Sequence, residues 1–327
     1  MKDTTKIYFM DENFRVGQHI HKVNSLLESI LYGLCSPINC AQIFISNPRS
    51  YNLPNIELSD IKRVRKIIDE YKFRVYVHGN LLYNLNGGTN IDVIDTLISN
   101  AKTQKQIEKY TEEKRKIPIY EQLTTTGIIE EMNICVDAFG PNTGVIVHIG
   151  SGKIKEKAIH RISQNINKIL YSTKGTLILE NAAGEGSKVG STLIDIKNII
   201  DNIKYKDRVF VCIDTCHLYA AGEYNIENKS EFERFLNDFD KLIGLDKLLL
   251  FHLNDSQQSF GCKKDRHSNI GLGHIFSSKE GMETLKFMIK YCHKHNIDMI
   301  LETTPYTSHY DLAIIYKLFF KDNIYDI

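Results

Sequence analysis

Histidines and carboxylates close a series of short apolar runs in this chain, and their spacing is its strongest chemical signal. A single polar residue at the end of such a run is ordinary. Six in succession on one face would bring several carboxylates together, and their repulsion is relieved only when cations lie between them. We therefore predict a multinuclear metal site. In chain order the six residues are His78, His148, Glu180, Asp214, His252 and Glu302.

The loop GCKKDRHSNIGLGHI, which follows the run ending at His252, offers two further ligands. Asp265 and His267 alternate in it, so their side chains point the same way if the segment is extended. His217, three residues after Asp214, would complete a third metal site with them. All the donors are imidazole nitrogens or carboxylate oxygens, a set that favours zinc, with manganese and iron as alternatives.

The remaining residues of these types carry weaker signals. The seven cysteines are scattered and form no CxxC pair, which argues against a disulfide framework and against a thiolate zinc cage. We interpret them as reduced core thiols, with a pair between Cys35 and Cys40 under oxidising conditions as the alternative. Four histidines fall in or beside predicted helices or in a tail loop and are interpreted as surface residues: His160, His293, His295 and His309.

Eight runs rich in β-branched residues alternate with helical segments, which predicts an α/β fold, a single (β/α)8 TIM barrel. In such a barrel the functional site lies at the C-terminal mouth of the strands, where the polar run ends would meet. Ser230 with Glu233 and Ser277 with Glu280 are capping boxes that predict two of the helix starts. The eight runs are 16–20, 41–46, 73–78, 144–149, 176–181, 208–213, 248–253 and 297–302.

No linker or repeat divides the chain, so residues 1–327 are predicted to form one domain. The connection between the third and fourth strands, around 90–135, is enlarged. It contains the charged segment AKTQKQIEKYTEEKRK at 101–116. We interpret this segment as a solvated helix face, with a contact to a partner or to a nucleic-acid backbone as the alternative.

Composition and charge narrow the class of protein. No apolar run is long enough to span a bilayer, and the start MKDTTKIYFMDENFRVG carries acidic residues where a signal peptide needs an apolar core. We expect a soluble intracellular protein, in cytoplasm, nucleus or virion according to its host. A net charge of +1 excludes a globally basic surface, so any nucleic-acid site must be local. Lys263, Lys264 and Arg266 form such a cluster beside the predicted metal ligands.

Seven sequence blocks, in order, resemble the successive signatures of the endonuclease IV family. They extend over most of the chain, which makes the resemblance specific. The blocks are QIFISNPRS at 42–50, VHGNLLYNLN at 77–86, ENAAGEGSKVG at 180–190, CIDTCHLYAAG at 212–222, HLNDS at 252–256, KDRHSNIGLGHI at 264–275 and LET at 301–303.

The resemblance implies a TIM barrel that holds three zinc ions, and it implies how the ligands divide among them. Glu180 would bridge two of the ions, and Glu180, Asp214 and Glu302 would be the catalytic residues. The ligands would be His78, His148 and Glu180 for the first ion; Glu180, Asp214, His252 and Glu302 for the second; and His217, Asp265 and His267 for the third.

Members of this family cleave the phosphodiester 5′ to an abasic deoxyribose, leaving a 3′-hydroxyl and a 5′-deoxyribose phosphate, and they trim blocked 3′ ends. The implied partner is double-stranded DNA with such lesions, with no obligate protein partner. The family bends DNA and fills the gap beside the flipped sugar with side chains. Arg49 stands where the family places a stack-penetrating arginine. The partner position, often aromatic, reads Leu81, so the wedge is Leu81 or Tyr83, unless both simply pack at the rim.

Three alternatives stay open at this point. A sugar or hydroxy-acid isomerase of the same barrel superfamily would use a mono- or dinuclear centre and leave the third ligand group without a role. A ribonuclease or damage-specific nuclease with a wider pocket would keep the metals and change the wedge. An inactive DNA-binding relative would have lost ligands, and every expected ligand is present. The block VHIGSGK departs from the family after His148 without removing a ligand.

Overall fold

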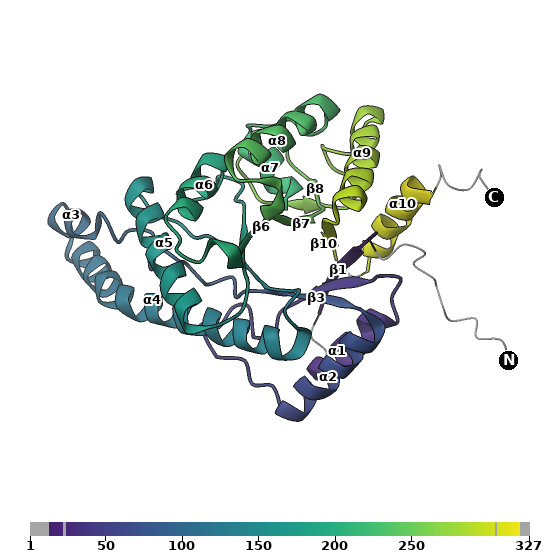
Figure 1. Ribbon diagram of the computed structural model, residues 1–327. Helices are drawn as coiled ribbons and strands as arrows, with labels where there is room; N and C mark the ends of the chain where they lie inside the picture. Colours follow the sequence, from purple (N-terminus) through teal and green to yellow (C-terminus); the bar gives the residue numbers. More distant parts are fainter. Residues whose placement is uncertain (1–12, 22–23, 305, 321–327) are drawn as a thin grey trace.

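A closed barrel of eight parallel strands forms the centre of the computed structural model, which describes residues 13–21, 24–304 and 306–320 (Figure 1). The eight predicted strands and the TIM-barrel fold are confirmed, and only the strand ends differ. The acidic start of the chain, on which the expectation of no signal peptide rests, lies largely outside the described residues. The strands are β1 Val16–Ile20, β2 Cys40–Ile43, β3 Arg74–His78, β4 Val145–His148, β5 Leu177–Glu180, β6 Val209–Asp214, β7 Leu248–His252 and β10 Asp298–Leu301.

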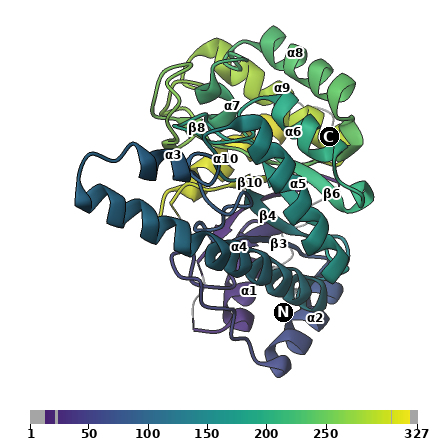
Figure 2. The same ribbon diagram turned by 90° about the vertical axis from the view of Figure 1, so that its left-hand side faces the viewer.

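Helices surround the barrel, and most of them pack an apolar face against the strands (Figures 1 and 2). Within the described ranges, none of them combines the length and the apolar character needed to cross a membrane. A short antiparallel pair, β8 Asp255–Ser256 and β9 His267–Ser268, lies after β7. The helices are α1 Leu26–Leu34, α2 Leu58–Tyr71, α3 Ile94–Ser99, α4 Gln104–Phe139, α5 Lys155–Ser172, α6 Leu193–Asp201, α7 Thr215–Ala221, α8 Lys229–Leu242, α9 Lys279–His295 and α10 Ser308–Phe320.

The two predicted capping boxes place the helix starts slightly wrongly. Helix α8 begins earlier, because the side chain of Asn228 accepts a hydrogen bond from the backbone N–H of Ser230. Helix α9 begins one residue later, because the hydroxyl of Ser278, and not that of Ser277, accepts from the N–H of Gly281. Asparagine caps helices as well as serine does, so neighbouring candidates compete at such starts.

An apolar layer inside the barrel supports the mouth. Alternate residues of a strand point to the same side, so the residue two positions after each member of this layer also points inward, at the C-terminal mouth. Those following residues include all six of the predicted strand-end ligands. The members of the layer are fully buried: Cys40, Tyr76, Ile146, Ile178, Cys212, Leu250 and Ile300.

The position of Cys40 in this layer decides the question of the disulfide. Its side chain lies inside the barrel, whereas Cys35 is exposed at the end of α1, and both are free thiols. The alternative of a bond between Cys35 and Cys40 is therefore wrong for this structure. All seven cysteines are free thiols, and five of them are buried, but the interpretation as core thiols is wrong for Cys35, which is exposed, and for Cys262, which is only partly buried.

The enlarged connection between β3 and β4 contains α3 and the 36-residue helix α4. At 1.5 Å per residue α4 is about 54 Å long, several times the length of a barrel strand. Its C-terminal half packs on the barrel through buried residues such as Ile128 and Met132, while most of 101–116 is exposed. Figures 1 and 2 show this exposed half projecting past the barrel, with α3 beside it. This exposure agrees with the interpretation of 101–116 as a solvated helix face, and the alternative of a contact to a partner or to a nucleic-acid backbone stays a prediction.

Candidate metal centre

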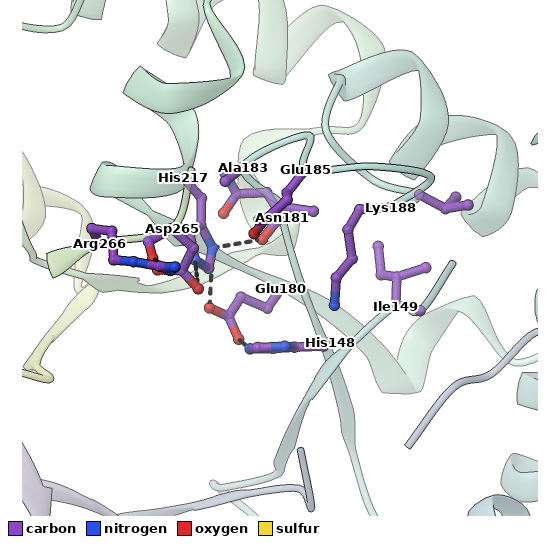
Figure 3. Close-up of a pocket in the computed structure, with 13 residues that line it drawn as sticks. His148, Ile149, Glu180, Asn181, Ala183, Glu185, Lys188, His217, Asp265 and Arg266 are labelled. Carbon is purple, nitrogen blue, oxygen red and sulfur yellow. Dashed lines mark hydrogen bonds and ion pairs between the residues drawn. The ribbon is translucent and has the colours of Figure 1, made fainter. Parts of the chain in front are cut away.

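The first group of candidate ligands joins the ends of three neighbouring strands, β3, β4 and β5. Nε2 of His78 lies 3.4 Å from Oε2 of Glu180, and Nε2 of His148 lies 3.1 Å from the same oxygen. Figure 3 shows His148 and Glu180 pointing toward each other at the strand ends. The donor atoms of His78, His148 and Glu180 all lie within 4.8 Å of one another, close enough to share one ion.

The second group uses the other oxygen of the same carboxylate. Nδ1 of His252 lies 3.2 Å from Oε1 of Glu180 and 3.3 Å from Oε2 of Glu302. Asp214 completes this group, again with all donor atoms within 4.8 Å. Glu180 thus turns one oxygen toward each group, which is the arrangement of a carboxylate that bridges two cations.

The third group lies over the mouth, where the loop after β7 meets the start of α7. Oδ2 of Asp265 lies 3.0 Å from Nε2 of His217, and Oδ1 lies 3.1 Å from Nε2 of His267. Asp265 and His267 therefore do point the same way, as the alternation of the loop predicted. Nε2 of His267 also lies 3.3 Å from Oδ2 of Asp214, so the second and third groups adjoin.

Hydrogen bonds from the rings orient three of the histidines. Nδ1 of His78 donates to the carbonyl of Gly79 at 2.8 Å, and Nδ1 of His217 donates to the carbonyl of Asn181 at 2.9 Å. Nε2 of His252 donates to Oε1 of Gln42 at 2.7 Å. In each ring the second nitrogen faces carboxylates and is left to bind a cation. Histidine ligands of metal ions are usually held in this way.

Three buried polar atoms in these groups have no hydrogen-bond partner: Oε2 of Glu180, Nε2 of His217 and Nε2 of His267. Burying such atoms unpaired costs about 1–3 kcal/mol each, more where the group is charged. Bound cations would satisfy all three. The donor set, imidazole nitrogen with carboxylate oxygen, suits zinc, so the residues fit the predicted metals.

The electrostatics of the centre keep its carboxylates ionised. Burial opposes ionisation of Glu180, but His148 and His252 outweigh it and hold the pKa of its carboxyl well below the usual value. Burial likewise opposes the charged form of His217, but Asp214 and Asp265 raise its pKa to about 10. Metal ions bind the ionised carboxylate and the neutral imidazole, so a bound cation would take the place of the proton on His217.

Cys216 is a neighbour that the sequence interpretation left as a core thiol. Its sulfur lies within 4.8 Å of donor atoms of Asp265 and His267. Burial raises the pKa of this thiol to about 12, and its Sγ donates to the carbonyl of Arg266 at 3.6 Å. The thiolate is the form that binds metals, so this environment keeps Cys216 a thiol and supports the original interpretation.

Sequence reasoning missed three polar residues that complete the mouth: His19, Gln42 and Asn254. Nδ2 of Asn254 donates to Oδ2 of Asp214 at 2.7 Å and to Oε2 of Glu302 at 3.2 Å. Nε2 of Gln42 donates to Oε1 of Glu302 at 2.7 Å. His19 pairs in register with Gln42 on the adjacent strand. The signal for His19 was present, because it stands near the end of the first run just as His78 ends the third.

The predicted DNA-contact residues divide into exposed and buried ones. Arg49 is exposed. Leu81 lies on an adjoining loop and is 44% exposed, and its backbone N–H donates to the carbonyl of Pro48. Tyr83 is only 7% exposed and packs into the core against Gly127 of α4. In this conformation the buried ring of Tyr83 is not available to fill a gap in DNA, which favours Leu81 of the two wedge candidates. The three cations of the loop after β7 are all exposed: Lys263, Lys264 and Arg266.

Comparison with known proteins agrees with this architecture. The family described as xylose isomerase-like TIM barrel matches residues 121–288. A probable endonuclease 4 of Halothermothrix orenii is 32% identical over 266 residues, which are 80% of this chain and 84% of that relative. An apurinic-apyrimidinic endonuclease 1 of Plasmodium falciparum is 30% identical over 325 residues, 97% of this chain and 49% of that relative.

Among solved structures, endonuclease IV from Thermus thermophilus superimposes with a TM-score of 0.72 at 21% identity, covering 94% of this chain and 99% of that one. At this identity the match by itself shows the fold. The identity to probable endonuclease 4, over most of the length of both proteins, shows more. The chain belongs to the endonuclease IV family.

Proposed function

We propose that this protein is a metal-dependent endonuclease that hydrolyses the phosphodiester 5′ to abasic sites in double-stranded DNA. The products would carry a 3′-hydroxyl and a 5′-deoxyribose phosphate, and blocked 3′ ends would be trimmed in the same site. The observation that carries the proposal is the third ligand group, Asp265 between His217 and His267, adjoining two groups that share Glu180. A sugar isomerase has no use for that group. The names of the relatives, endonuclease 4 and apurinic-apyrimidinic endonuclease 1, support the choice of substrate.

We assign three zinc ions to the centre, with manganese or iron as alternatives at individual positions. When bound, such ions acidify a water molecule and neutralise charge on phosphate oxygens. No protein nucleophile is then needed. The ligands would be His78, His148 and Glu180 for the first ion; Glu180, Asp214, His252 and Glu302 for the second; and His217, Asp265 and His267 for the third.

The carboxylates of Glu180, Asp214 and Glu302 are the catalytic residues of this proposal. Glu302 accepts one hydrogen bond on each oxygen, from Gln42 and from Asn254, so its carboxylate has a fixed orientation. Asp214 accepts from the backbone N–H of His217 at 2.8 Å and from Asn254. Groups fixed in advance need little reorganisation during the reaction, which is the main source of electrostatic catalysis.

Recognition of the lesion would use the loops around the mouth. The loop bearing Arg49 and the loop bearing Leu81 are hydrogen-bonded to each other, so the two exposed side chains can act together on one gap in the base stack. Lys263, Lys264 and Arg266 would contact the phosphate backbone beside the metal centre.

The test combines metal analysis with nicking. We expect about three zinc ions per chain by elemental analysis, and cleavage of a duplex with one tetrahydrofuran abasic analogue but not of a matched intact duplex. Glu180→Gln should abolish cleavage, whereas Glu70→Gln, an exposed residue in the last turn of α2 and far from the mouth, should not. One or two ions without nicking would favour an isomerase. Lesion binding without nicking at any metal load would indicate an inactive relative.

A further inference from the structure

His19 carries a buried ring nitrogen for which the structure provides no partner. The residue lies on β1 and pairs in register with Gln42 of β2. Its Nδ1 lies 3.0 Å from Nε2 of Gln42, but its Nε2 is buried and has no hydrogen-bond partner. His19 lines the same pocket as His78 and Glu302, so the unpaired nitrogen lies beside the metal centre. A buried polar atom of this kind is costly unless a ligand completes it.

The hydrogen bonds of Gln42 determine which ring nitrogen of His19 carries the hydrogen. The amide Nε2 of Gln42 lies 2.7 Å from Oε1 of Glu302, and its Oε1 accepts from His252. The reverse orientation of the amide would place two oxygens against each other. The NH2 group can only donate, so its second hydrogen goes to Nδ1 of His19. Nδ1 is therefore the bare nitrogen, and Nε2 bears the hydrogen.

His19 is thus a neutral donor held in place by the frame of the metal centre. Burial lowers the pKa of His19 to about 3, so the ring carries no charge near neutral pH. The absence of charge suits the position, because a cation at this depth would be repelled by the metal ions that the centre is built to hold. A neutral N–H can contact an anionic oxygen without competing with those ions.

We propose that Nε2 of His19 donates a hydrogen bond to a non-bridging phosphate oxygen of the bound DNA strand. This inference rests on the proposed function, since the pocket it shares with the metal ligands is where a DNA backbone must enter to be cleaved. A phosphate oxygen has no hydrogen and only accepts, so it matches a ring nitrogen that only donates. His19 would then position the strand without being a metal ligand.

Two substitutions test the roles of the two ring nitrogens of His19 separately. His19→Gln places an amide N–H at about the reach of Nε2. The shorter His19→Asn keeps an acceptor for Gln42 near the place of Nδ1, but its own N–H does not reach the place of Nε2. Binding is measured with the zinc-loaded protein and a pre-nicked product duplex, which is not consumed, over a series of salt concentrations. Metal content, kcat and KM are measured beside it.

We expect His19→Asn to weaken binding of the nicked duplex about ten- to hundredfold, the loss of one hydrogen bond to a charged acceptor. His19→Gln should recover most of the affinity. Both variants should keep the full metal content. Neither should change the slope of log K against log salt, because a neutral donor releases no counterion, whereas Lys264→Ala should reduce that slope by about 0.9.

A loss of affinity in His19→Gln with none in His19→Asn would show that His19 only accepts the hydrogen bond of Gln42, and it would overturn the proposal. Equal losses in the two variants would overturn it as well, because an N–H at the reach of Nε2 would then make no difference. A reduced salt slope in His19→Asn would show a charged ring and would overturn it as well. Failure of the proposed function has a different signature, since the wild-type protein would then not nick the abasic duplex at all.

Discussion

At the scale of single residues, Leu81 and Tyr83 show how two positions of one loop acquire different tasks. Leu81 is exposed beside the loop of Arg49, while Tyr83 is buried and lies close to the carboxyl group of Glu131 on α4, which contributes to raising the pKa of the Tyr83 hydroxyl. Leu81→Ala should lower kcat/KM for an abasic duplex about tenfold, because the wedge loses part of the roughly 1.5–3 kcal/mol that burying a leucine provides. Tyr83→Phe should leave kcat/KM nearly unchanged and lower the free energy of unfolding by about 1 kcal/mol.

The check is steady-state nicking together with urea unfolding of both variants. If Tyr83→Phe, and not Leu81→Ala, impaired nicking, the loop would have to rearrange on DNA and expose the tyrosine ring. Equal kcat/KM values for Leu81→Ala and the wild type would mean that Leu81 only packs at the rim.

Glu131 is a buried carboxyl group. Burial raises its pKa from 4.5 to about 7, although Ser46, Tyr83 and the nearby His78 act to lower it. Between these two pH values the unfolded chain releases a proton that the folded protein keeps. The contribution of Glu131 to the free energy of unfolding therefore falls as the pH rises from about 4.5 to about 7, and it is constant above that. Glu131→Gln cannot titrate, so at pH 8 it should be more stable than the wild type by an amount of order 3 kcal/mol.

This prediction is measured as the difference in unfolding free energy between Glu131→Gln and the wild type at several pH values. The difference cancels the pH dependence of metal binding, which both proteins share. It should shrink toward zero as the pH approaches 4.5. A difference that does not vary with pH would mean that Glu131 is ionised throughout.

The sequence predicted single residues best where their chemical type was decisive. The strand-end candidates could be picked out because histidines and carboxylates are unexpected on the inward face of a barrel, and the structure brings them together at its mouth. Gln42 and Asn254 could not be found in this way, because amides are common at strand ends and their role depends on which carboxylates they face. The choice between Leu81 and Tyr83 stayed open, because the sequence shows that a loop is present but not which of its side chains turn inward.

At the scale of elements, the loop after β7 depends on the buried carboxylate of Asp255. Its oxygens accept hydrogen bonds from the backbone N–H groups of Gly271, Gly273 and Ile275 at 2.8–3.1 Å. Asp255 also belongs to β8, and β8 pairs with β9, the strand that carries His267. One side chain thus holds the loop over the mouth and positions the third ligand group.

Asp255→Ala should therefore reduce the metal content by about one ion per chain, because it leaves these N–H groups without an acceptor, and it should lower stability by about 3 kcal/mol. The first two ligand groups come mainly from strand ends and should keep their ions. Elemental analysis beside Lys264→Ala, an exposed change in the same loop, tests this. A full metal load in Asp255→Ala would show that other contacts hold the loop.

Strands were easier to predict than helix starts because they combine two signals, β-branched composition and an even spacing along the chain. Helix starts depend on which of several adjacent polar side chains reaches a free N–H, and Asn228 and Ser278 each prevailed over a neighbour. The pair β8 and β9 could not be predicted at all, since two-residue strands leave no periodic pattern.

At the scale of the whole molecule, a net charge of +1 means that long-range attraction to DNA is weak and that phosphate contacts must be local. Lys263 offers a clean test, because its backbone has φ 56°, a left-handed conformation that glycine adopts more easily than lysine. Lys263→Gly removes the charge and relieves about 1 kcal/mol of backbone strain. We expect the salt slope for binding of the abasic duplex to fall by about 0.9 while the fold stays intact.

Lys72 provides a matched control at the other end of the barrel. It ends α2 with φ 51°, so Lys72→Gly makes the same change of charge and of backbone conformation away from the mouth. Because only charges within about 10 Å of the bound phosphates act strongly at ordinary ionic strength, Lys72→Gly should leave the salt slope unchanged. If the two variants lowered the slope equally, the whole surface and not the mouth would attract DNA. A decrease confined to Lys263→Gly would show that a nearly neutral protein confines its attraction for DNA to the rim of its metal centre.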